Sequence, residues 1–591
     1  MNGAEYIAEF LRQRGSDKVF LLTGGACAFV VDAIARNPGI DYFCFQHEQA
    51  AAIAADAVWR INGKVGVTLA TSGPGATNLL TGIACSYFDS IPAIHITGQV
   101  NQIEKQEYLN AKVRQGGFQE TNIVDMAKPV TKYAVKVDTI EQLKYELTKA
   151  YNIAISGRMG SVLIDVPMDV QKADAGENIL YEPPEIESPL LDKEIQKIQE
   201  QIQNNFEMSS RPAVLIGGGI GLAGVNKEIM AWIQENKLPF GSSWHGLSYF
   251  DQTSSTYLGP VGVYGNRGAN ALMQNCDYLL VLGSRLDSRQ RSGNAKNFAP
   301  NAKVQVIDVD IEELNKYISN KYQTNLLDLK QLPRVLKDMK SIKQNQNWLA
   351  YVGEIREKYF NKNISTFAVK QKTLSPYEVI EKINKLIPSE AIVTVDCGGS
   401  QCWVHQAFRR TTQTFFTSGG MAPMGYSLPA AIGASLTSPN RQVFAFTGDG
   451  GLQVNLQELQ TVMHYKLNIK IIIMNNNGYG IIKQFQDSYF EGRYEATGRG
   501  VSNVNFEALS LAYKLSYTRV DKINQLDASV LNKAGPGIIE CVFHENTLIE
   551  PKVEMGLPIN DQFPYVSDEE FSWANRFSNI ERSISIKSPK N

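Results

Sequence analysis

Apolar residues in the first part of the chain fall into short runs that alternate with longer stretches of helical periodicity. The runs have the length and the Val, Ile, Leu and Phe content of buried strands. The predicted strands are Lys18–Leu22, Tyr42–Phe45, Val65–Ala70, Ala93–Thr97 and Val162–Val166. The clearest helix is Glu48–Asn62, which Gly63 closes. Strands that alternate with helices predict a parallel sheet covered by helices on both faces.

The same alternation recurs twice further along the chain. The later predicted strands are Ala213–Ile216, Tyr278–Gly283, Val304–Asp308, Ile392–Val395, Val443–Thr447 and Ile469–Met474. Between these blocks, residues 171–190 are acidic and contain proline, and residues 341–372 are rich in Lys, Gln and Asn, so both are interpreted as connectors. The last 40 or so residues show little periodicity.

The fold class predicted from this pattern is α/β, with three doubly wound parallel-sheet domains. The expected boundaries are 1–180, 190–340 and 365–550, followed by a C-terminal tail at 551–591. A length of 591 residues fits three or four ordinary domains.

Composition excludes several classes of partner. The net charge of −2 gives no basic field for nucleic acid, and no apolar run approaches the ~20 residues of a membrane helix. The seven cysteines are odd in number and scattered through apolar segments, which is typical of a reducing compartment. With no signal-like N-terminus, the protein is expected to be cytoplasmic and soluble.

The strongest chemical signal lies between residues 448 and 480. One strand ends in Gly448-Asp449-Gly450-Gly451, a helix follows, and the next strand ends in Asn475-Asn476-Asn477-Gly478. The ends of neighbouring parallel strands meet at one edge of the sheet, where a carboxylate and an amide oxygen suit Mg²⁺ and glycines admit phosphate. Either segment alone would be an ordinary turn; together they predict a metal and diphosphate site.

At these residues the sequence resembles the thiamine-diphosphate enzyme superfamily, whose signature is GDG followed by NN after a similar interval. The resemblance implies that Asp449 and Asn476 supply side-chain oxygens to Mg²⁺ and that Gly478 adds its backbone carbonyl. It also implies that Gly448, Gly450 and Gly451 contact the cofactor diphosphate.

The superfamily places a glutamate after the second strand of its N-terminal domain, where it activates the aminopyrimidine of the cofactor. In FCFQHEQAAAIAADAVWR this residue is Glu48. An isolated Glu there would be an ordinary first-turn residue, but the surrounding segment matches the family. His47 is either an acid–base group or a packed neighbour of Glu48.

The segment TSGPGATNLLTGIACSYFDSIP (71–92) matches the family's loop and helix after the third strand. A generic Gly-rich loop is the alternative interpretation. The cofactor contacts expected from this half of the chain are Gly25, Pro74 and Asn78. In the family these elements face the diphosphate domain of a second subunit, which implies a homodimer or homotetramer.

Over nearly its whole length the chain is most similar to acetohydroxyacid (acetolactate) synthase catalytic subunits. Phe118 and Gln119 match family residues that line the pocket for the reacting keto acids. In SGGMAPMGYSLPAAIGA, Met424 matches the residue between the cofactor rings, and Ala422 the acceptor for its 4′-amino group. Core packing is the alternative for Phe118 and Met424.

The segment GGSQCW resembles the part of that family that contacts the diphosphate from the other side. It supplies Gly398, Ser400 and Gln401, of which Gln401 is shared with the family and Ser400 differs.

The middle block resembles the family's FAD-binding domain, in which the flavin has a structural role. GGGIG (217–221) contains Gly218, and GSRLDSRQRSG and IDVDIEELNK provide Arg285 and Asp308 as flavin candidates. Alone, a Gly-rich turn is weak support for a flavin, and the two charged residues would be read as a surface charge and a strand-end cap.

Several positions depart from the synthase pattern where the second substrate would lie. Met168 replaces a lysine, Tyr264 a histidine and Phe485 a tryptophan, whereas Arg289 keeps an arginine that can pair with an acceptor carboxylate. The tail at 548–571 also differs from the synthase tail that closes the site.

The predicted function is therefore a carboligase that decarboxylates pyruvate or a similar 2-keto acid and transfers the two-carbon unit to a diverged carbonyl acceptor. A nucleotide-linked keto sugar is one candidate acceptor. The alternatives are a true acetolactate synthase, or a 2-keto acid decarboxylase or oxidase on the same fold. The presence of Glu48, Asp449 and Asn476 argues against a catalytically inactive binding protein.

Overall fold

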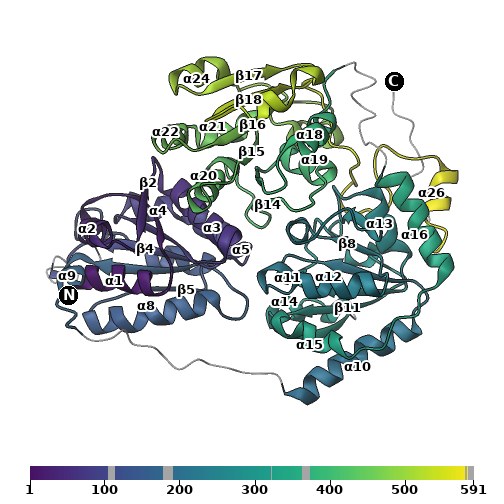
Figure 1. Ribbon diagram of the computed structural model, residues 1–591, viewed down its shortest axis with the longest axis horizontal. Coiled ribbons are helices and arrows are strands. Elements are labelled where there is room, and N and C mark those ends of the chain that lie inside the picture. Colours follow the sequence, from purple (N-terminus) through teal and green to yellow (C-terminus); the bar gives the residue numbers. More distant parts are fainter. Residues whose placement is uncertain (104–112, 178–190, 321, 362–372, 579–581, 583–591) are drawn as a thin grey trace.

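The computed structural model describes residues 1–103, 113–177, 191–320, 322–361, 373–578 and 582. Three lobes are visible in Figure 1: the N-terminal domain at the left, the middle domain at the right, and the C-terminal domain above the gap between them. Each lobe is built on one six-stranded sheet whose paired strands are all parallel, which confirms the predicted fold class.

The N-terminal sheet has the strand order β2-β1-β3-β4-β6-β5. Its strands are β1 (Lys18–Leu22), β2 (Asp41–Cys44), β3 (Gly66–Ala70), β4 (Ala93–Gln99), β5 (Tyr133–Lys136) and β6 (Val162–Pro167). Its helices are α1 (Gly3–Gln13), α2 (Ala28–Arg36), α3 (Glu48–Asn62), α4 (Pro74–Asn78), α5 (Leu80–Phe88), α7 (Ile123–Ala127), α8 (Ile140–Ile155) and α9 (Met168–Lys172).

The middle sheet has a different order, β12-β11-β10-β7-β8-β9. Its strands are β7 (Pro212–Ile216), β8 (Phe240–Ser242), β9 (Tyr257–Pro260), β10 (Tyr278–Leu282), β11 (Lys303–Asp308) and β12 (Gln323–Leu326). Its helices are α10 (Asp192–Met208), α11 (Gly219–Leu222), α12 (Asn226–Glu235), α13 (Arg267–Asn275), α14 (Ile311–Asn315), α15 (Leu332–Lys337) and α16 (Gln346–Tyr359).

The C-terminal sheet repeats the order of the N-terminal one, as β14-β13-β15-β16-β18-β17. Its strands are β13 (Ile392–Val395), β14 (Thr414–Thr417), β15 (Val443–Gly448), β16 (Ile469–Asn475), β17 (Ser516–Val520) and β18 (Gly537–Val542). Its helices are α18 (Pro376–Leu386), α19 (Gly399–Ala407), α20 (Ser427–Thr437), α21 (Asp449–Val454), α22 (Leu459–His464), α23 (Gly480–Phe490), α24 (Phe506–Ala512) and α25 (Ala528–Leu531).

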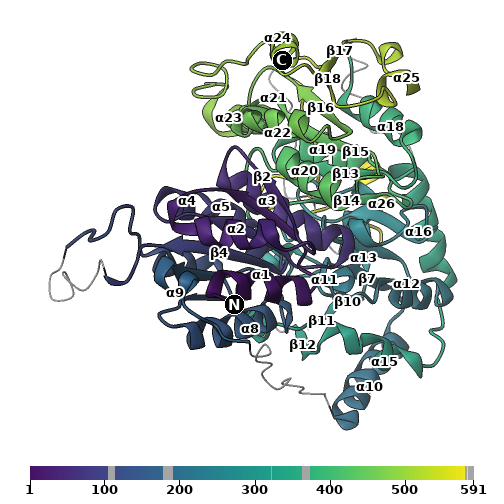
Figure 2. The same ribbon diagram turned by 60° about the vertical axis from the view of Figure 1, so that its left-hand side comes forward.

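Helix α3 has the predicted bounds because its sequence contains both signals that limit it. His47 caps the N-terminus, and Gly63 ends the helix in the left-handed conformation with φ 72°. Alanines line most of the helix and let it pack against α20 of the C-terminal domain, so that one core spans both domains (Figure 2). The approach is close: a Cβ on Gly433 would stand 2.3 Å from the carbonyl oxygen of Ala54.

One segment predicted to be an irregular connector contains a regular helix. The connector at 341–372 contains helix α16, whose Trp348, Tyr351, Val352 and Ile355 are buried at helical spacing. Most Lys, Gln and Asn residues of this segment flank the helix, and they hid its periodicity. Of the other predicted connector, residues 178–190 lie outside the described residues, as do 362–372.

Residues 559–577 of the predicted tail pack against the middle domain. Helix α26 (Asp568–Ala574) lies beside α16 in Figure 1, and Ile559, Trp573 and Phe577 contribute to the middle-domain core. Aromatic anchors, rather than a repeating apolar period, fix this segment, which is why periodicity alone missed it. Within the described residues, no helix is long and apolar enough to cross a membrane.

Candidate active site

The predicted diphosphate residues lie together at the carboxyl edge of the C-terminal sheet. Strands β13 and β15 are neighbours there, and the chain leaves them toward opposite sides of the sheet, which is the switch point where ligands bind in such folds. One cavity occupies this point. Among the residues that line it are Gly398, Ser400, Gln401, Ala422, Met424, Gly448, Asp449, Gly450, Gly451, Asn476 and Gly478.

Asp449 is the charged centre of this cavity. Its side chain is buried, and Oδ2 accepts hydrogen bonds from the Gly478 backbone N–H at 2.7 Å and from Asn503 Nδ2 at 2.7 Å. Burial raises the pKa of Asp449, and these donors act against the rise. A buried carboxylate at the N-terminus of α21 is well placed to hold a cation beside an anionic ligand.

The residues around Asp449 fit a magnesium ion. The buried amide nitrogen Nδ2 of Asn476 has no hydrogen-bond partner among the described residues. Because amide nitrogen and oxygen exchange by a simple flip, this position equally presents an oxygen. In the described part of the chain no three His, Cys, Asp or Glu side chains group around a metal position, so the set here is one carboxylate with neutral oxygens, as Mg²⁺ accepts.

At Gly450 the backbone lies too close to its neighbours to carry a side chain. A Cβ on Gly450 would stand 2.3 Å from the Tyr479 ring and 3.3 Å from Met424 Cε. Gly450 and Gly451 also begin α21, so their N–H groups belong to the first turn, where helices bind phosphate. This arrangement fits a diphosphate group.

The loop that carries Ala422 and Met424 is strained, and hydrogen bonds to Asp396 hold it in place. Ala422 has a φ of 48°, a left-handed conformation that is uncommon for a residue with a side chain. Asp396, which sequence reasoning missed, accepts hydrogen bonds from the Gly425 N–H at 3.0 and 3.1 Å and from the Thr447 hydroxyl at 2.8 Å. Burial raises the pKa of Asp396 to about 6. It joins the ends of β13 and β15 to this loop.

In the N-terminal domain, Glu48 is buried at the first turn of α3. Asn78 Nδ2 donates to Glu48 Oε2 at 3.0 Å, which brings together two of the predicted residues. His47 Nδ1 accepts from the Gln49 N–H at 3.1 Å, so its side chain caps the helix next to Glu48. Glu48 does not line the cavity that holds Asp449 in the same chain.

The other predicted residues of this domain gather around the ends of β1 and β3. The Ala26 N–H, next to Gly25, donates to Thr71 Oγ1 at 3.2 Å. A Cβ on Gly73, next to Pro74, would stand 2.9 Å from the Cβ of Gln119. Phe118 is 83% exposed and contributes to no core, so the packing alternative is wrong for it. These residues form a surface rather than a closed pocket.

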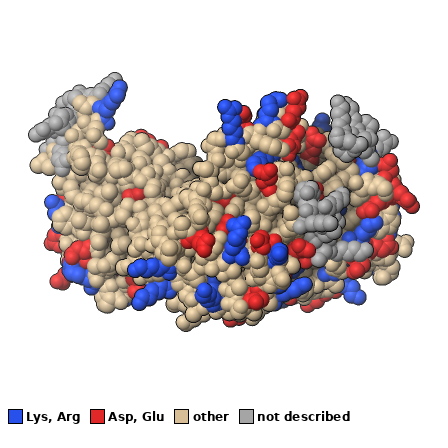
Figure 3. All heavy atoms as spheres, turned by 90° about the horizontal axis from the view of Figure 1, so that it is seen from above, with Lys and Arg blue, Asp and Glu red and all other residues tan. Residues whose placement is uncertain are grey.

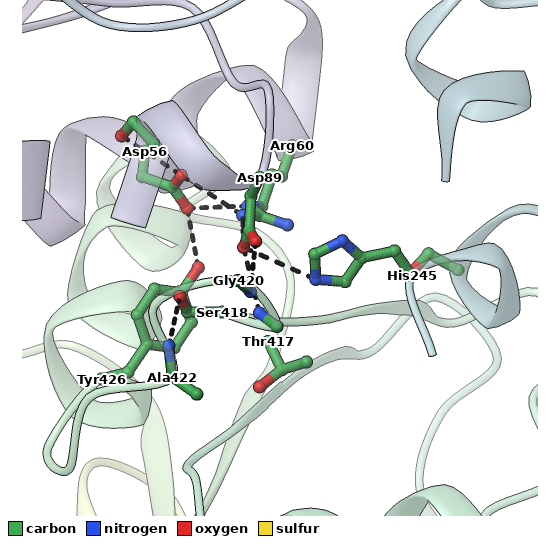
Figure 4. Close-up of polar contacts among 12 residues, drawn as sticks. Asp56, Arg60, Asp89, His245, Thr417, Ser418, Gly420, Ala422 and Tyr426 are labelled. Carbon is green, nitrogen blue, oxygen red and sulfur yellow. Dashed lines mark hydrogen bonds and ion pairs between the residues drawn. The ribbon is translucent and has the colours of Figure 1, made fainter. Parts of the chain in front are cut away.

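A buried polar network joins all three domains beneath the loop of Ala422, as Figure 4 shows. Asp89 accepts from Arg60 Nη2 at 2.9 Å and from the backbone N–H groups of Gly419 and Gly420 at 3.2 and 2.7 Å. His245 of the middle domain places Nε2 3.5 Å from Asp89. The loop therefore depends on an N-terminal carboxylate for its position.

Asp56 completes this network from α3. It accepts from Arg60 Nε at 2.7 Å and from the Tyr426 hydroxyl at 2.6 Å. The side chains of Asp56 and Asp89 are fully buried and that of Arg60 is 6% exposed. Burial acts to raise the pKa of Asp89, but His245 and Arg60 outweigh it and the pKa is lowered. Asp89 is thus held as an anion.

A second cavity lies at the carboxyl edge of the middle sheet. The order of this sheet places the switch point between β7 and β10, and the segments after these strands contain Gly218 and Arg285. Both line the cavity together with Asp308, Asp89 and His245. Burial raises the pKa of Asp308. The three residues predicted for a flavin are therefore brought together in one cavity.

Of the four predicted substrate residues, two line a cavity and two do not. Arg289 lines both cavities, and its guanidinium lies over the Trp244 ring at 5.9 Å from the ring centre. Tyr264 lines the second cavity. Met168 begins α9, and Phe485 on α23 is 46% exposed and packs on Tyr489; both lie outside the two cavities.

Sequence reasoning also missed Glu458, next to the Glu48 segment. It is buried and accepts from the Gln46 N–H at 3.1 Å and from the Thr461 hydroxyl. Burial raises the pKa of Glu458 to about 7. The sequence around Glu458 gives no sign of a raised pKa, because part of the environment of its carboxyl group comes from a segment more than 400 positions away.

Comparison with known proteins agrees with this geometry. Residues 1–126 match the N-terminal TPP binding domain of thiamine pyrophosphate enzymes, residues 196–328 their central domain, and residues 396–541 their C-terminal TPP binding domain. Three such domains, with a diphosphate-type cavity in the last, define a thiamine-diphosphate-dependent enzyme.

Two relatives show to which family of these enzymes the chain belongs. The acetolactate synthase large subunit of Lactococcus lactis subsp. lactis (strain IL1403) is 33% identical over 563 residues, which cover 94% of this chain and 95% of that protein. The acetolactate synthase isozyme 2 large subunit of Escherichia coli (strain K12) is 32% identical over 564 residues, which cover 94% and 98%. The chain belongs to the acetolactate synthase large-subunit family of thiamine-diphosphate enzymes.

Proposed function

We propose that the protein decarboxylates pyruvate, or a similar 2-keto acid, and joins the remaining two-carbon unit to a second carbonyl compound. The observation that carries this proposal is the cavity in which buried Asp449 and Asn476 face a cradle of glycines. Bound thiamine diphosphate would supply the heterocycle that stabilises the carbanion left by loss of carbon dioxide.

The residues of this chain would hold the metal and the cofactor and exchange a proton with it. Asp449, Asn476 and the backbone carbonyl of Gly478 would hold Mg²⁺, and the first turn of α21 would bind the diphosphate. Glu48 would hold a proton on its carboxyl group and exchange it with a ring nitrogen of the cofactor, while Asn78 fixes the orientation of that carboxyl group.

The active form that we propose is a homodimer or homotetramer. Within one chain Glu48 lies outside the cavity of Asp449, so a second copy is needed to bring the two together. Large apolar side chains are exposed around the switch points of the N- and C-terminal domains, among them Phe118, Met421, Ile482 and Phe485. Seen from above, the left-hand part of the molecule carries few charged side chains, as is usual at subunit interfaces (Figure 3).

FAD is the proposed ligand of the second cavity, in a non-redox role. The middle sheet has the strand order of dinucleotide-binding folds; Gly218 and Arg285 follow the two strands of its switch point, and Asp308 ends the neighbouring strand. The Arg285 guanidinium has no hydrogen bond or ion pair among the residues the structure describes, which leaves it available to an anionic ligand. Flavin absorbance of the purified protein, and flavin release on denaturation, test this; a colourless active preparation would refute it.

The acceptor is proposed to differ from a second pyruvate, with a nucleotide-linked keto sugar as one candidate. Tyr264, which lines the second cavity, stands where the synthase pattern has a histidine. Met168 and Phe485 replace a lysine and a tryptophan, but they lie outside the two cavities of one chain, so they bear on the acceptor only where a second copy completes the site. Arg289 favours the other reading, a true acetolactate synthase, because it faces both cavities and could pair with a keto-acid carboxylate. Decarboxylation or oxidation of the keto acid without ligation is the remaining alternative.

The deciding experiment measures kcat/KM for acetolactate formation from pyruvate alone and for coupling of pyruvate to a panel of ketones and aldehydes. A better acceptor than pyruvate supports a diverged carboligase. If acetolactate forms efficiently and no other acceptor competes, the enzyme is an acetolactate synthase with an altered pocket.

A further inference from the structure

The segment that leads into Glu48 is held by the C-terminal domain of the same chain. The Cys44 N–H at the end of β2 donates to the Tyr465 hydroxyl at 2.8 Å, and the rings of Phe43 and Tyr465 meet edge to face with their centres 5.4 Å apart. Tyr465 closes helix α22, which lies above β2 in Figures 1 and 2. This edge strand of the N-terminal sheet therefore takes part of its support from another domain.

Glu458, just before α22, makes the contact nearest to Glu48. Glu458 is fully buried, and its Oε1 and Oε2 accept from the Gln46 N–H at 3.1 and 3.3 Å. The Thr461 hydroxyl donates to Oε2 at 2.6 Å and keeps the carboxyl group turned toward Gln46. A carboxyl group buried to this degree is costly unless donors satisfy it, so the contact is a defined one.

The hydrogen bond at Gln46 sets how the chain enters helix α3. His47 is the N-cap, and Glu48 is the first residue of the helix, so only one residue separates Gln46 from Glu48. The Glu48 carboxyl group has a narrow place: Asn78 donates to Oε2 at 3.0 Å, and a Cβ on Gly75 would stand 3.3 Å from Oε1. A shift of the Gln46 backbone would take the carboxyl group out of this place.

The turn that carries Glu458 is fixed by the cofactor loop. It directly follows α21, the helix that begins at Asp449. Asn455 Nδ2 donates to the carbonyl oxygen of Gly425 at 2.8 Å, and the Glu458 N–H donates to the carbonyl oxygen of Asn455 at 3.0 Å. Glu458 thus belongs to a rigid part of the C-terminal domain and can impose a position on the Glu48 segment.

We propose that Glu458 is a positioning residue for Glu48. Its carboxyl group fixes the start of α3 and so the place from which the Glu48 carboxyl group reaches the cofactor of a second copy. This inference rests on the proposed function, in which Glu48 exchanges a proton with that cofactor. Proton exchange needs hydrogen-bond reach, and a displacement of about 1 Å costs up to about a hundredfold in rate.

The test uses the holoenzyme of the wild type and of Glu458→Ala, Glu458→Asp, Glu458→Gln, Glu48→Gln and the double variant Glu48→Gln/Glu458→Ala. It measures kcat for pyruvate consumption, the dissociation constant of thiamine diphosphate, and amide hydrogen exchange of peptides from residues 43–50 by mass spectrometry. The matched control is Asp277→Ala in the middle domain, since Asp277 also accepts from backbone N–H groups, those of Ser210 and Arg211 at 3.0 and 2.8 Å.

We expect Glu458→Ala to lower kcat by about ten- to a hundredfold and to speed hydrogen exchange at residues 43–50. Thiamine-diphosphate affinity should stay near that of the wild type, because Asp449 and Asn476 keep their places. Glu458→Asp, whose shorter side chain withdraws from Gln46, should lose about tenfold in kcat. Glu458→Gln keeps an accepting oxygen and should retain most of the activity, and Asp277→Ala should change neither kcat nor this exchange.

The double variant separates positioning from a general structural role. If Glu458 acts through Glu48, the double variant is no slower than Glu48→Gln alone, because the group that Glu458 positions is already lost. Losses that multiply would overturn the proposal. So would wild-type kcat in Glu458→Ala and Glu458→Asp, or unchanged exchange at residues 43–50 in Glu458→Ala. If Glu458→Ala does not fold, Glu458→Asp replaces it in the same comparisons.

Failure of the proposed function would look different. If the wild type consumes no pyruvate, the carboligase proposal fails, and hydrogen exchange alone decides on Glu458. Faster exchange at residues 43–50 in Glu458→Ala than in Asp277→Ala would still support Glu458 as the residue that fixes the Glu48 segment. Equal exchange in the two variants would overturn it.

Discussion

Replacement of Asp89 by asparagine tests whether the buried network positions the cofactor loop. The change keeps the shape of the side chain and removes its charge. In the wild type this carboxylate accepts from Arg60 at 2.9 Å and from two backbone N–H groups of the loop, those of Gly419 and Gly420. An asparagine has one accepting oxygen, and its NH₂ group would face donors.

The size of the effect follows from burial. Removing one partner of a buried ion pair costs about 3–5 kcal/mol. Arg60 retains Asp56 at 2.7 Å, and the asparagine oxygen still accepts one loop N–H, so we expect Asp89→Asn to lower the free energy of unfolding by about 2–3 kcal/mol. Asp32→Asn is the matched control, since its ion pair with Arg36 is exposed and worth less than about 1 kcal/mol.

The test measures the stability of the variants and their affinity for thiamine diphosphate. Urea titrations give the free energy of unfolding of both variants, and calorimetry gives the dissociation constant of thiamine diphosphate in the presence of Mg²⁺. Met424 lines the cofactor cavity only a few residues beyond Gly420, so a loosened loop should weaken cofactor binding by about tenfold, or about 1.4 kcal/mol. If Asp89→Asn matches Asp32→Asn in both stability and cofactor affinity, the network does not position the loop and the reasoning fails.

Three further predictions address the other buried carboxylates. Glu48→Gln should reduce pyruvate turnover by at least about a hundredfold while thiamine-diphosphate affinity and the far-UV circular dichroism stay near those of the wild type, because the shape and the contact with Asn78 remain and the titrating group is lost; near-normal turnover would refute the role. Asp449→Ala should abolish Mg²⁺-dependent retention of thiamine diphosphate, and an unchanged affinity by calorimetry would count against the metal site. Burial raises the pKa of Glu458 from 4.5 to about 7, so the folded wild type binds more protons than the unfolded chain between these values and loses stability as the pH rises through them. Relative to the wild type, Glu458→Gln should therefore gain stability in urea titrations from pH 4.5 to 7, and a difference that does not vary with pH would contradict this.

Local patterns accounted for much of the fold. Strand β1, strand β13 and helix α3 have the predicted bounds, because strand runs and helix caps are written in neighbouring residues. Other strands, such as β5, β12 and β17, were not predicted; they lie at sheet edges, where partial exposure weakens the apolar signal. Helix α16 was missed because the polar residues that flank it dominated the composition of the segment.

The sequence by itself determined the three parallel-sheet domains and the chemistry of the strand ends, including Asp449 and Asn476, because a ligand site at a strand end needs only a strand, a glycine turn and a helix in succession. Only the tertiary structure decided which charges share a buried environment. Asp89 meets Gly420, and Glu458 meets Gln46, across more than 300 positions of the chain. A buried charge is stable only with partners that the folded chain supplies, and those partners come from segments whose proximity no local pattern encodes.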